Sequence, residues 1–293
     1  VVKHKSLVSN LILFARWGCW YTKSLESGNW KRPQNWILLT FNIEKIMNSP
    51  VEQFTIKVLY ELNIMGIDIS FTNASLFMIL SILGSAGFLY IGARKQALVP
   101  NRFQSLVEMS YLFVANMVKE NAGNGSQAYF PFIFTLFMFI LFGNLLGMIP
   151  YSYTFTSQIA VTFTLAAIVF IGVTIIALFK HGFKFFTFFF PSGVPIGLAP
   201  LLIPIEIISY FIRPISLSVR LFANMLAGHT MMKVFAGLII MMGSASGFLK
   251  VGAILPLMAV VGLTGLEFLV AALQAYVFSI LTCMYLHDAI HLH

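Results

Sequence analysis

The stretch from residue 197 to residue 285 is apolar almost throughout, and it contains no polar loop long enough to leave a bilayer. A single soluble core cannot hide so much apolar surface, because 59% of the 293 residues are hydrophobic and only 10% are charged. The mean hydropathy, +0.88, agrees with this conclusion. The sequence therefore predicts an all-α polytopic membrane protein with several transmembrane helices.

The chain divides into a polar N-terminal extension, residues 1–47, and a single membrane domain, residues 48–293. A helix needs roughly 20 apolar residues to cross a hydrocarbon layer about 30 Å thick. Segments of that length predict three transmembrane helices, at 73–91, 130–149 and 157–179. Two longer apolar segments, interrupted only by prolines and glycines, predict a helical hairpin at about 197–242 and 248–287.

Two other segments are amphipathic. Pro100–Glu120 has apolar residues at helical spacing beside charged ones such as Arg102 and Glu108, which predicts a helix on the membrane surface. A shorter segment, Val51–Leu62, also carries apolar residues at helical spacing and is expected at the interface.

Loop charges predict the orientation of the spans. The connection between the first two spans contains Arg94, Lys95, Arg102 and Lys119, and Lys180 and Lys184 follow the third span. The turn Tyr151–Ser157 carries no charge. Because basic loops stay on the cytoplasmic or matrix side, the N-terminus is expected on the opposite side and the C-terminus on the basic side.

One arginine, Arg220, lies inside the longest apolar stretch. Its guanidinium stays ionised at any accessible pH, and placing it near the membrane centre costs roughly 2.5–3.5 kcal/mol even on a lenient insertion scale. Glu206, His229 and Glu267 lie in similarly apolar surroundings. Four charged or titratable groups in one buried region suggest an ion path.

Helical spacing indicates which polar groups share a face. Ser216, Arg220 and Asn224 follow one another at intervals of four residues and so lie on one face of their helix. On the last helix, Glu267 and Gln274 are seven residues apart, so both can point at the same partner helix.

Each of these groups also has a purely structural explanation, which the sequence leaves open. Arg220 could bond to backbone carbonyls, and Glu206 could pair with Arg213, seven residues on. His229 and Glu267 could form a static ion pair between two helices. Other polar residues could serve only as contacts between helices or at headgroup level, namely Gln274, Asn144 and His181.

Two long motifs carry a resemblance to a known family: SLSVRLFANMLAGHT at 216–230 and GLEFLVAALQAYVF at 265–278. Shorter motifs support it, namely NSPVEQF from residue 48, FTNASLF from 71, NLLGMIPYS from 144 and PLLIPIEIISYFIRPISL from 200. Over most of the chain from Asn48 to His293 the sequence resembles subunit a of the rotary ATP synthases, in particular its mitochondrial members, where it is called subunit 6. Residues 1–47 are not covered.

The resemblance implies a role for the polar groups. Arg220 matches the arginine that faces a ring of small rotor subunits and releases their buried carboxylates from the protonated state. Gln274 matches a glutamine that faces this arginine, and Asn224 matches a polar residue one turn beyond it. In this family the last two helices form a strongly tilted, nearly horizontal hairpin around the ring.

Two half-channels are implied by the same resemblance. His229 and Glu267 match the pair that lines the half-channel open to the intermembrane space, and Glu206 matches the acid of the half-channel open to the matrix. Further channel-lining residues are possible at Asn144, His181 and Ser216. Many bacterial relatives have an acid after the asparagine of the second span, where this chain has Gly147.

The implied function is that of a proton-translocating stator subunit in a rotary motor for ATP synthesis, without a catalytic site of its own. The implied partners are the ring of subunit c, the peripheral stalk, other membrane subunits and the lipid bilayer. The coupling ion is expected to be the proton; no cofactor or metal is expected, and a bound lipid such as cardiolipin is possible.

Other functions fit the sequence less well. There is no nucleotide-binding loop, and no basic stripe for nucleic acid. A secondary proton-coupled transporter would show two related halves, which are not seen. A purely structural membrane subunit is the second alternative.

The cellular membrane is also suggested by the resemblance. Histidine at 229 combined with glutamate at 267 is similar to mitochondrial and alphaproteobacterial members of the family, and the 30 phenylalanines suit an AT-rich organellar genome. The inner mitochondrial membrane is therefore expected, with the N-terminus toward the intermembrane space and the C-terminus toward the matrix. A bacterial inner membrane is the alternative.

Overall fold

The computed structural model describes residues 54–61, 63–64, 67–68, 70–94, 99–149, 152–182, 185, 199–244 and 251–290. The expected extension at 1–47 lies outside these residues. The described residues belong to one compact unit, Pro50–His293.

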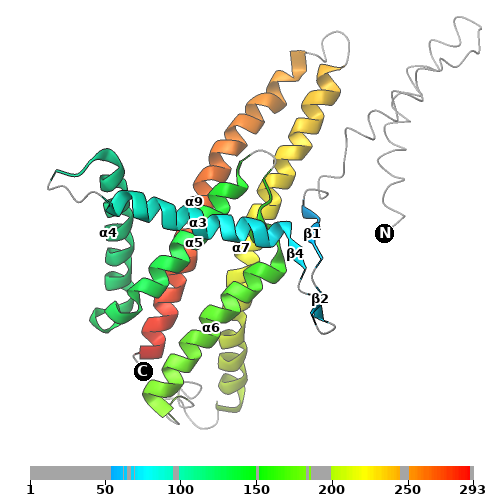
Figure 1. The fold of residues 1–293 in the computed structure, drawn as a ribbon. Coiled ribbons are helices and arrows are strands. Elements are labelled where there is room, and N and C mark those ends of the chain that lie inside the picture. The colour runs from blue at the N-terminus through cyan, green and yellow to red at the C-terminus, as the bar shows by residue number, and fades with distance from the viewer. Residues whose placement is uncertain are drawn as a thin grey trace, which may run out of the picture. The chain divides into compact units, whose positions relative to one another are not determined.

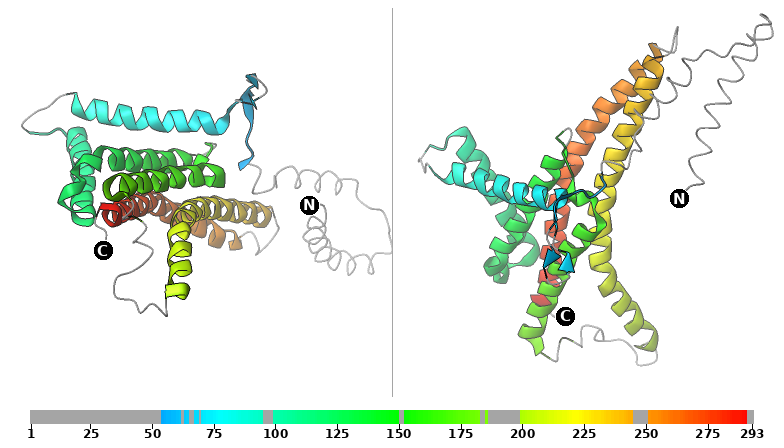
Figure 2. Two further views of the ribbon diagram at one scale, coloured as in Figure 1. Left: turned by 90° about the horizontal axis from the view of Figure 1, so that it is seen from below. Right: turned by 45° about the vertical axis from the view of Figure 1, so that its right-hand side comes forward.

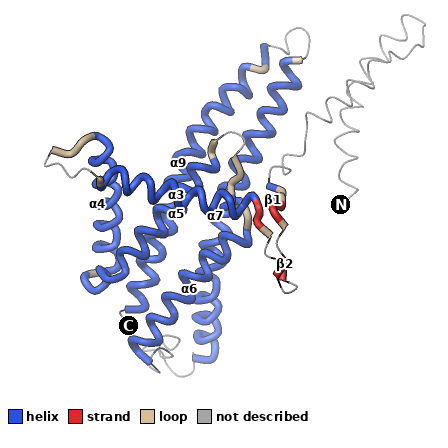
Figure 3. Tube along the Cα trace, in the orientation of Figure 1, coloured by secondary structure: helices blue, strands red, loops and turns tan. Residues whose placement is uncertain are grey.

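Long helices make up nearly all of this unit (Figures 1 and 3). They are α3 (Asn73–Ala93), α4 (Arg102–Ala122), α5 (Phe130–Gly147), α6 (Ile159–His181), α7 (Ala199–Gly243) and α9 (Ile254–Ile290). All of them except α4 are long and apolar enough to cross a membrane. The predicted class, an all-α polytopic membrane protein, is confirmed, and the ends of the three short spans differ from the prediction by no more than two residues.

Two small strand pairs precede α3. β1 (Val58–Tyr60) pairs antiparallel with β4 (Phe71–Thr72), and β2 (Asn63–Ile64) pairs with β3 (Ile67–Asp68). The helical spacing expected across Val51–Leu62 is therefore wrong over Val58–Tyr60. The backbone there bonds to a neighbouring strand instead, and Lys57 N donates to Asn73 Oδ1 at 3.2 Å.

Local sequence explains where several helices begin. The Thr72 side chain accepts a hydrogen bond from Ser75 N and caps α3, and the Asn101 side chain caps α4. α4 ends at Gly123, whose φ of 77° favours glycine, and a 3-10 turn, η2 (Asn124–Tyr129), leads into α5. Pro131 lies in the first turn of α5, where its missing N–H leaves no bond unmade.

α5 is the most buried of the candidate spans. In its most apolar stretch 44% of the residues are buried, against 11–17% in the other four candidate spans. It packs against α3, α4 and α9. Fully buried residues on its surface include Ile133 and Ile140, and they share one core cluster with Leu221 of α7 and Phe278 of α9.

α4 is amphipathic as predicted, but it is not only a surface helix. Its residues Val114, Met117, Val118 and Ala122 are buried in the same core cluster as α5 and α9. The sequence pattern showed the apolar face of α4 but could not show that this face packs against protein.

α7 and α9 form the expected hairpin and lie side by side, antiparallel (Figure 1). With 45 residues, α7 extends for about 67 Å, twice the thickness of a hydrocarbon layer. It bends clearly in Figure 2, and Pro204 and Pro214 within the helix explain a bend because each removes a backbone hydrogen bond. In Figure 1 the hairpin crosses α3, which is just long enough to span a membrane, at a steep angle.

The connections gather at two ends of the unit. At one end, Gln158 Nε2 donates to Phe54 O at 2.6 Å, which joins the residues before β1 to the turn between α5 and α6. At the other end, His181 Nε2 lies 3.1 Å from Ala289 O, which joins the last residues of α6 and α9. The loop charges predict the same grouping, with the N-terminus beside the uncharged turn and the C-terminus beside the basic end of α6.

Candidate functional site

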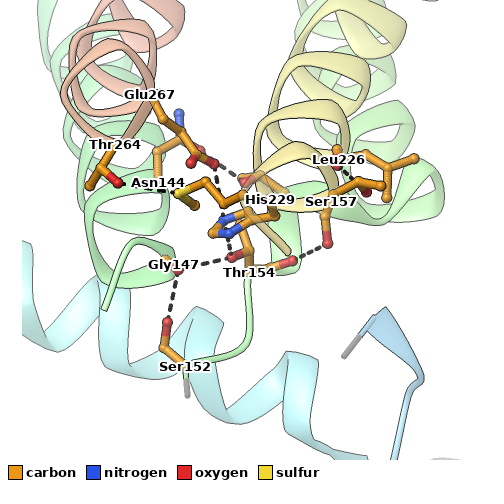
Figure 4. Close-up of polar contacts among 12 residues, drawn as sticks. Asn144, Gly147, Ser152, Thr154, Ser157, Leu226, His229, Thr264 and Glu267 are labelled. Carbon is orange, nitrogen blue, oxygen red and sulfur yellow. Dashed lines mark hydrogen bonds and ion pairs between the residues drawn. The ribbon is translucent and has the colours of Figure 1, made fainter. Parts of the chain in front are cut away.

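His229 of α7 and Glu267 of α9 face each other inside the hairpin (Figure 4). His229 Nε2 lies 3.5 Å from Glu267 Oε1, and both side chains are buried. Gly228 makes this approach possible, since a Cβ there would lie only 2.7 Å from Glu267 Oε1. The structure thus brings together two residues that are 38 positions apart in the sequence.

A threonine from the turn between α5 and α6 completes this group. Thr154 Oγ1 lies 3.1 Å from His229 Nε2 and 3.2 Å from Gly147 O, and only 3% of Thr154 is exposed. We call Thr154, His229 and Glu267 the turn-side cluster. It contains an imidazole with a hydroxyl at hydrogen-bond distance and a carboxyl at 3.5 Å, and groups of these kinds can pass a proton along a chain.

Asn144 lies next to this cluster and is fully buried. Its Nδ2 donates to Ala271 O of α9 at 3.1 Å, and its Oδ1 accepts from Thr156 Oγ1 at 2.9 Å. Both ends of the amide are therefore used to join α5, α9 and η3 (Phe155–Ser157), which fits the structural explanation that the sequence left open.

A second polar group lies toward the C-terminal end of α9. Arg213 Nη1 of α7 forms an ion pair with Asp288 Oδ2 of α9 at 3.0 Å. The guanidinium carbon also lies 5.8 Å from the ring centre of Tyr210 and 5.3 Å from that of Tyr285, within the range of cation–π interaction. We call these four residues the C-terminal cluster.

The C-terminal cluster lines a small cavity of about 20 Å³, closed on the other side by Phe170, Val173 and Ala177 of α6. A volume of this size holds a single water. Tyr210 OH is 2.7 Å from Thr174 Oγ1 of α6. The cavity lies between α6, α7 and α9, and its walls are mostly apolar, with Arg213 and Asp288 as their charged members.

Glu206 lies one turn before Tyr210 on α7 and is half-buried. Among the described residues Glu206 forms no ion pair with Arg213, which bonds to Asp288 instead. Glu206 lies in the first part of α7, one to two turns before Tyr210 and Arg213 of the C-terminal cluster.

Arg220 is exposed on the surface of α7. Within the described ranges its guanidinium has neither a hydrogen bond nor an ion pair, so it is not locked onto backbone carbonyls. On either side of it along α7 lie Arg213, about 10 Å away, and His229, about 13 Å away, at 1.5 Å per residue. Arg220 is thus an unpaired cation on the outer face, between the two clusters.

The other predicted residues occupy different environments. Ser216 is exposed like Arg220, and Asn224 is half-buried. Gln274 is buried, as is Glu267, so both point inward from α9 as their spacing predicted. His181 contacts Ala289 O, a carbonyl in the last turn of α9 that has no partner within its own helix.

Two parts of the site were missed by the sequence-based prediction. Thr154 and Thr156 belong to an uncharged turn, so nothing distinguished them from ordinary loop residues. Asp288 lies in a short polar tail, HDAIHLH, at the end of the sequence. A carboxylate in such a tail has no signal of its own; only the fold brings Asp288 to Arg213.

Tyr153, in the turn between α5 and α6, is not ionised. Burial raises the pKa of the Tyr153 phenol, and the hydrogen bond that Gln158 Nε2 donates to its oxygen opposes this only in part. The phenol therefore stays neutral and packs against Phe77. No three histidine, cysteine or acidic side chains in the described part of the chain come close enough to hold a metal ion.

The chain is similar to known proteins over most of its length. The family model described as ATP synthase A chain matches residues 75–287. The ATP synthase subunit a of Parvibaculum lavamentivorans is 58% identical over 242 residues, which are 83% of this chain and 93% of that protein. The ATP synthase subunit a of Rhodospirillum rubrum is 56% identical over 84% of this chain and 100% of its own length. That of Rhizobium etli is 59% identical over 83% of this chain and 98% of its own length. Because the family model matches more than half of the chain and these relatives are 56–59% identical to it over nearly their whole length, the chain belongs to the ATP synthase A chain family.

Proposed function

We propose that this chain is the proton-translocating stator subunit of a rotary ATP synthase, in which Arg220 separates two half-channels. One observation carries the proposal: among the described residues Arg220 is an exposed and unpaired cation on α7, with the buried turn-side cluster on one side of it and the half-buried C-terminal cluster on the other. The turn-side cluster contributes to one half-channel. The C-terminal cluster, with Glu206, contributes to the other.

The electrostatics of this arrangement prevents a direct leak. On α9, Glu267 and Asp288 are 21 residues apart, about 31 Å along the helix axis. Between them a permanent positive charge repels a hydronium ion but attracts an ionised carboxylate on a passing rotor helix. A proton can therefore cross only by riding on the rotor. Each elementary charge that crosses 100 mV supplies about 2.3 kcal/mol, which biases the rotation.

The outer face of the hairpin is suited to a rotor made of apolar helices. Large apolar side chains are exposed on both helices of the hairpin, among them Val219 next to Arg220 on α7, and Leu266, Leu269 and Leu273 on α9. A ring of subunit c that turns against this face would present its carboxylates to Arg220. The other helices leave apolar surface for lipid and for neighbouring membrane subunits, including those of the peripheral stalk.

The membrane is expected to be an energy-coupling inner membrane. The relatives named above are bacterial, so a bacterial inner membrane is supported by them, whereas the mitochondrial assignment rests on the sequence resemblance alone. We expect the turn-side cluster to open to the side of high proton potential and the C-terminal cluster to the opposite side. We expect the proton as coupling ion, and no cofactor bound to this chain.

The test is Arg220→Ala in the assembled ATP synthase. We expect ATP-driven proton pumping in membrane vesicles to fall to background while the complex still assembles and binds its rotor. A matched control is Arg102→Ala, which removes an exposed arginine from the start of α4. Pumping at the wild-type rate in the Arg220→Ala complex would show that this chain has a structural role only.

A further inference from the structure

Thr154 is the only residue of the turn-side cluster for which neither the sequence motifs nor the proposed function supplies a role. Its hydroxyl has two polar neighbours, Gly147 O at 3.2 Å and His229 Nε2 at 3.1 Å (Figure 4). The residue is 3% exposed, so bulk water does not compete for these contacts.

The hydroxyl has a single proton to share between these neighbours. A carbonyl oxygen can only accept, so when Thr154 donates to Gly147 O, its oxygen must accept from an Nε2–H of His229. When Nε2 carries no proton, the hydroxyl can rotate and donate to it instead. Gly147 O is not left unsatisfied in that case, because Ser152 Oγ donates to it at 2.9 Å.

We propose that Thr154 is a hydrogen-bond switch that partners His229 Nε2 in both of its protonation states, the hydroxyl rotating between Gly147 O and the imidazole. This inference rests on the proposed passage of protons through His229 and Glu267. Thr154 does not itself carry the proton to Glu267, so it is a positioning residue.

The proton transfer that the switch serves is simple to balance. The Nε2–H bond of a protonated His229 breaks, the electron pair stays on Nε2, and an O–H bond forms at Glu267 Oε1. Imidazolium becomes neutral imidazole, and carboxylate becomes carboxylic acid. The 3.5 Å between Nε2 and Oε1 is slightly beyond an ordinary hydrogen bond, so a small approach of the two side chains completes the path.

Without Thr154 the product of this transfer would be disfavoured. A buried imidazole nitrogen without a hydrogen bond is destabilised, and the loss of a typical hydrogen bond corresponds to a change of about fivefold to tenfold in a rate or equilibrium. A hydroxyl is the smallest group that can both accept and donate at the same point, and valine has its shape without that capacity.

The surroundings hold the backbone and the side chain of Thr154 in place while leaving its hydroxyl proton free to rotate. Ser157 donates to Thr154 O from both its backbone N–H and its side chain. Against α5, a Cβ at residue 147 would lie 2.5 Å from Thr154 Oγ1, so glycine is needed there. The Phe54 ring packs edge-on against the His229 ring from the other side, with 6.2 Å between their centres.

The test compares four variants in the whole complex by ATP-driven proton pumping, with assembly measured in parallel. Thr154→Val should slow pumping by about fivefold to tenfold, and Thr154→Ser should restore the rate to within about twofold of wild type. Ser152→Ala should slow it by about twofold to threefold, because Gly147 O then retains the Thr154 proton. Thr162→Val is the matched control: within the described residues this buried threonine donates to carbonyls at the start of its own helix, those of Gln158 and Ile159, and its rate should not change.

The outcomes separate the switch from the function on which it rests. If Thr154→Val pumps at the wild-type rate, or if Thr154→Ser is as slow as Thr154→Val, Thr154 acts by packing alone and the switch is wrong. A wild-type rate in Ser152→Ala would contradict the part of the switch in which the Thr154 hydroxyl donates to Gly147 O. Glu267→Gln is measured beside these variants. If it has no effect, the half-channel itself is wrong, whatever the threonine variants do.

Discussion

The carboxyl group of Glu267 is buried without hydrogen bonds to the described residues. Its carboxyl oxygens are buried, and among the described residues no donor lies within hydrogen-bond distance of either one. The nearest titratable group is His229. Burying an ionised carboxylate is costly unless it is paired or hydrogen-bonded, so Glu267 is stable either as a neutral acid or with a protonated His229 beside it. A group with two such states is suited to exchange a proton.

Glu267→Gln tests this exchange. The amide keeps the shape of the side chain but cannot bind or release a proton, so we expect proton flux to slow by about tenfold or more, yet not to stop, because His229 and water can still bring protons to the rotor. Passive proton flux through vesicles, measured across a range of pH, checks the prediction. Rates equal to wild type at every pH would remove Glu267 from the path.

Gly228→Ala tests the spacing of the pair. A Cβ at this position would lie 2.7 Å from Glu267 Oε1 and 2.8 Å from Cδ, so the carboxyl must move away from His229. We expect slower proton pumping in an assembled complex. Gly237→Ala on the same helix is the matched control, because a Cβ there meets nothing within 4 Å. Equal rates for the two variants would show that the separation of His229 and Glu267 is unimportant.

At this scale the sequence indicated the charged members of the site but not their uncharged partners. Arg220, Glu206, His229 and Glu267 are conspicuous because ionisable groups are costly in apolar surroundings. Thr154 gave no such signal, since a hydroxyl in a turn is ordinary. Its contact with His229 joins residues 75 positions apart and depends on the packing of α5 against the hairpin.

Among the elements, α7 and α9 are held together by different interactions along their length. Arg213 and Asp288 form an ion pair near one end, and the side chains are 25% and 37% exposed. Such a partly exposed pair is screened by solvent and contributes modestly.

A double-mutant cycle measures this contribution. We expect Arg213→Met and Asp288→Asn each to lower the thermal stability of the purified complex, and the double variant to lose less than the sum of both. The coupling should be about 1 kcal/mol, as is typical for a partly exposed ion pair. Additive losses would mean that the contact between Arg213 and Asp288 does not contribute to the joining of α7 and α9.

The contact between α3 and α4 offers a second test of how the helices pack. A Cβ at Gly92 would lie 2.4 Å from Val107 Cγ2, so the two helices meet through a glycine. We expect Gly92→Ala to lower stability by about 1–3 kcal/mol, as overpacking does. Gly87→Ala on the same helix meets nothing within 4 Å and serves as the control. Equal thermal midpoints for both variants would contradict close packing at Gly92.

The elements were largely predictable because apolar length is a strong signal. The ends of α3, α5 and α6 fell within two residues of the expected spans. The strands before α3 were missed because their pairing depends on residues 58–60 and 71–72, which no local period relates. The burial of one face of α4 was missed because an apolar stripe looks the same against lipid as against protein.

For the molecule as a whole, the connections define two opposite ends. Phe54 and Gln158 meet at one of them, and His181 and Ala289 meet at the other. Together with the loop charges, this predicts that the N-terminal side of the membrane domain and the turn between α5 and α6 lie on one face of the membrane, and that the basic ends of α4 and α6 lie on the other.

Labelling from one side tests this topology. In a background in which Cys19 and Cys283 are replaced, Lys119→Cys and Lys180→Cys should react with a membrane-impermeant thiol reagent from the same side of sealed vesicles. Ile149→Cys, which is 54% exposed, should react only from the other side. Labelling of all three from one side would contradict the orientation.

The fold class and the order of the helices were predictable from the sequence, but the contacts between helices were not. Composition and span length gave a polytopic helical protein, and the motifs placed the ionisable residues on the hairpin. Neither could show that α5 is the most buried span, nor that Arg213 meets Asp288, since both depend on how six helices share one core.

The close approach of Thr154 to Gly147 also limits how sequences of this family can diverge. A larger residue at 147 would occupy the space of the Thr154 side chain, so mutation at one position must be accompanied by mutation at the other. Homologues with an acid near position 147 are therefore expected to carry a different residue, or a different turn length, where this chain has threonine. The pair should stand out as a coevolving couple in any large set of aligned sequences.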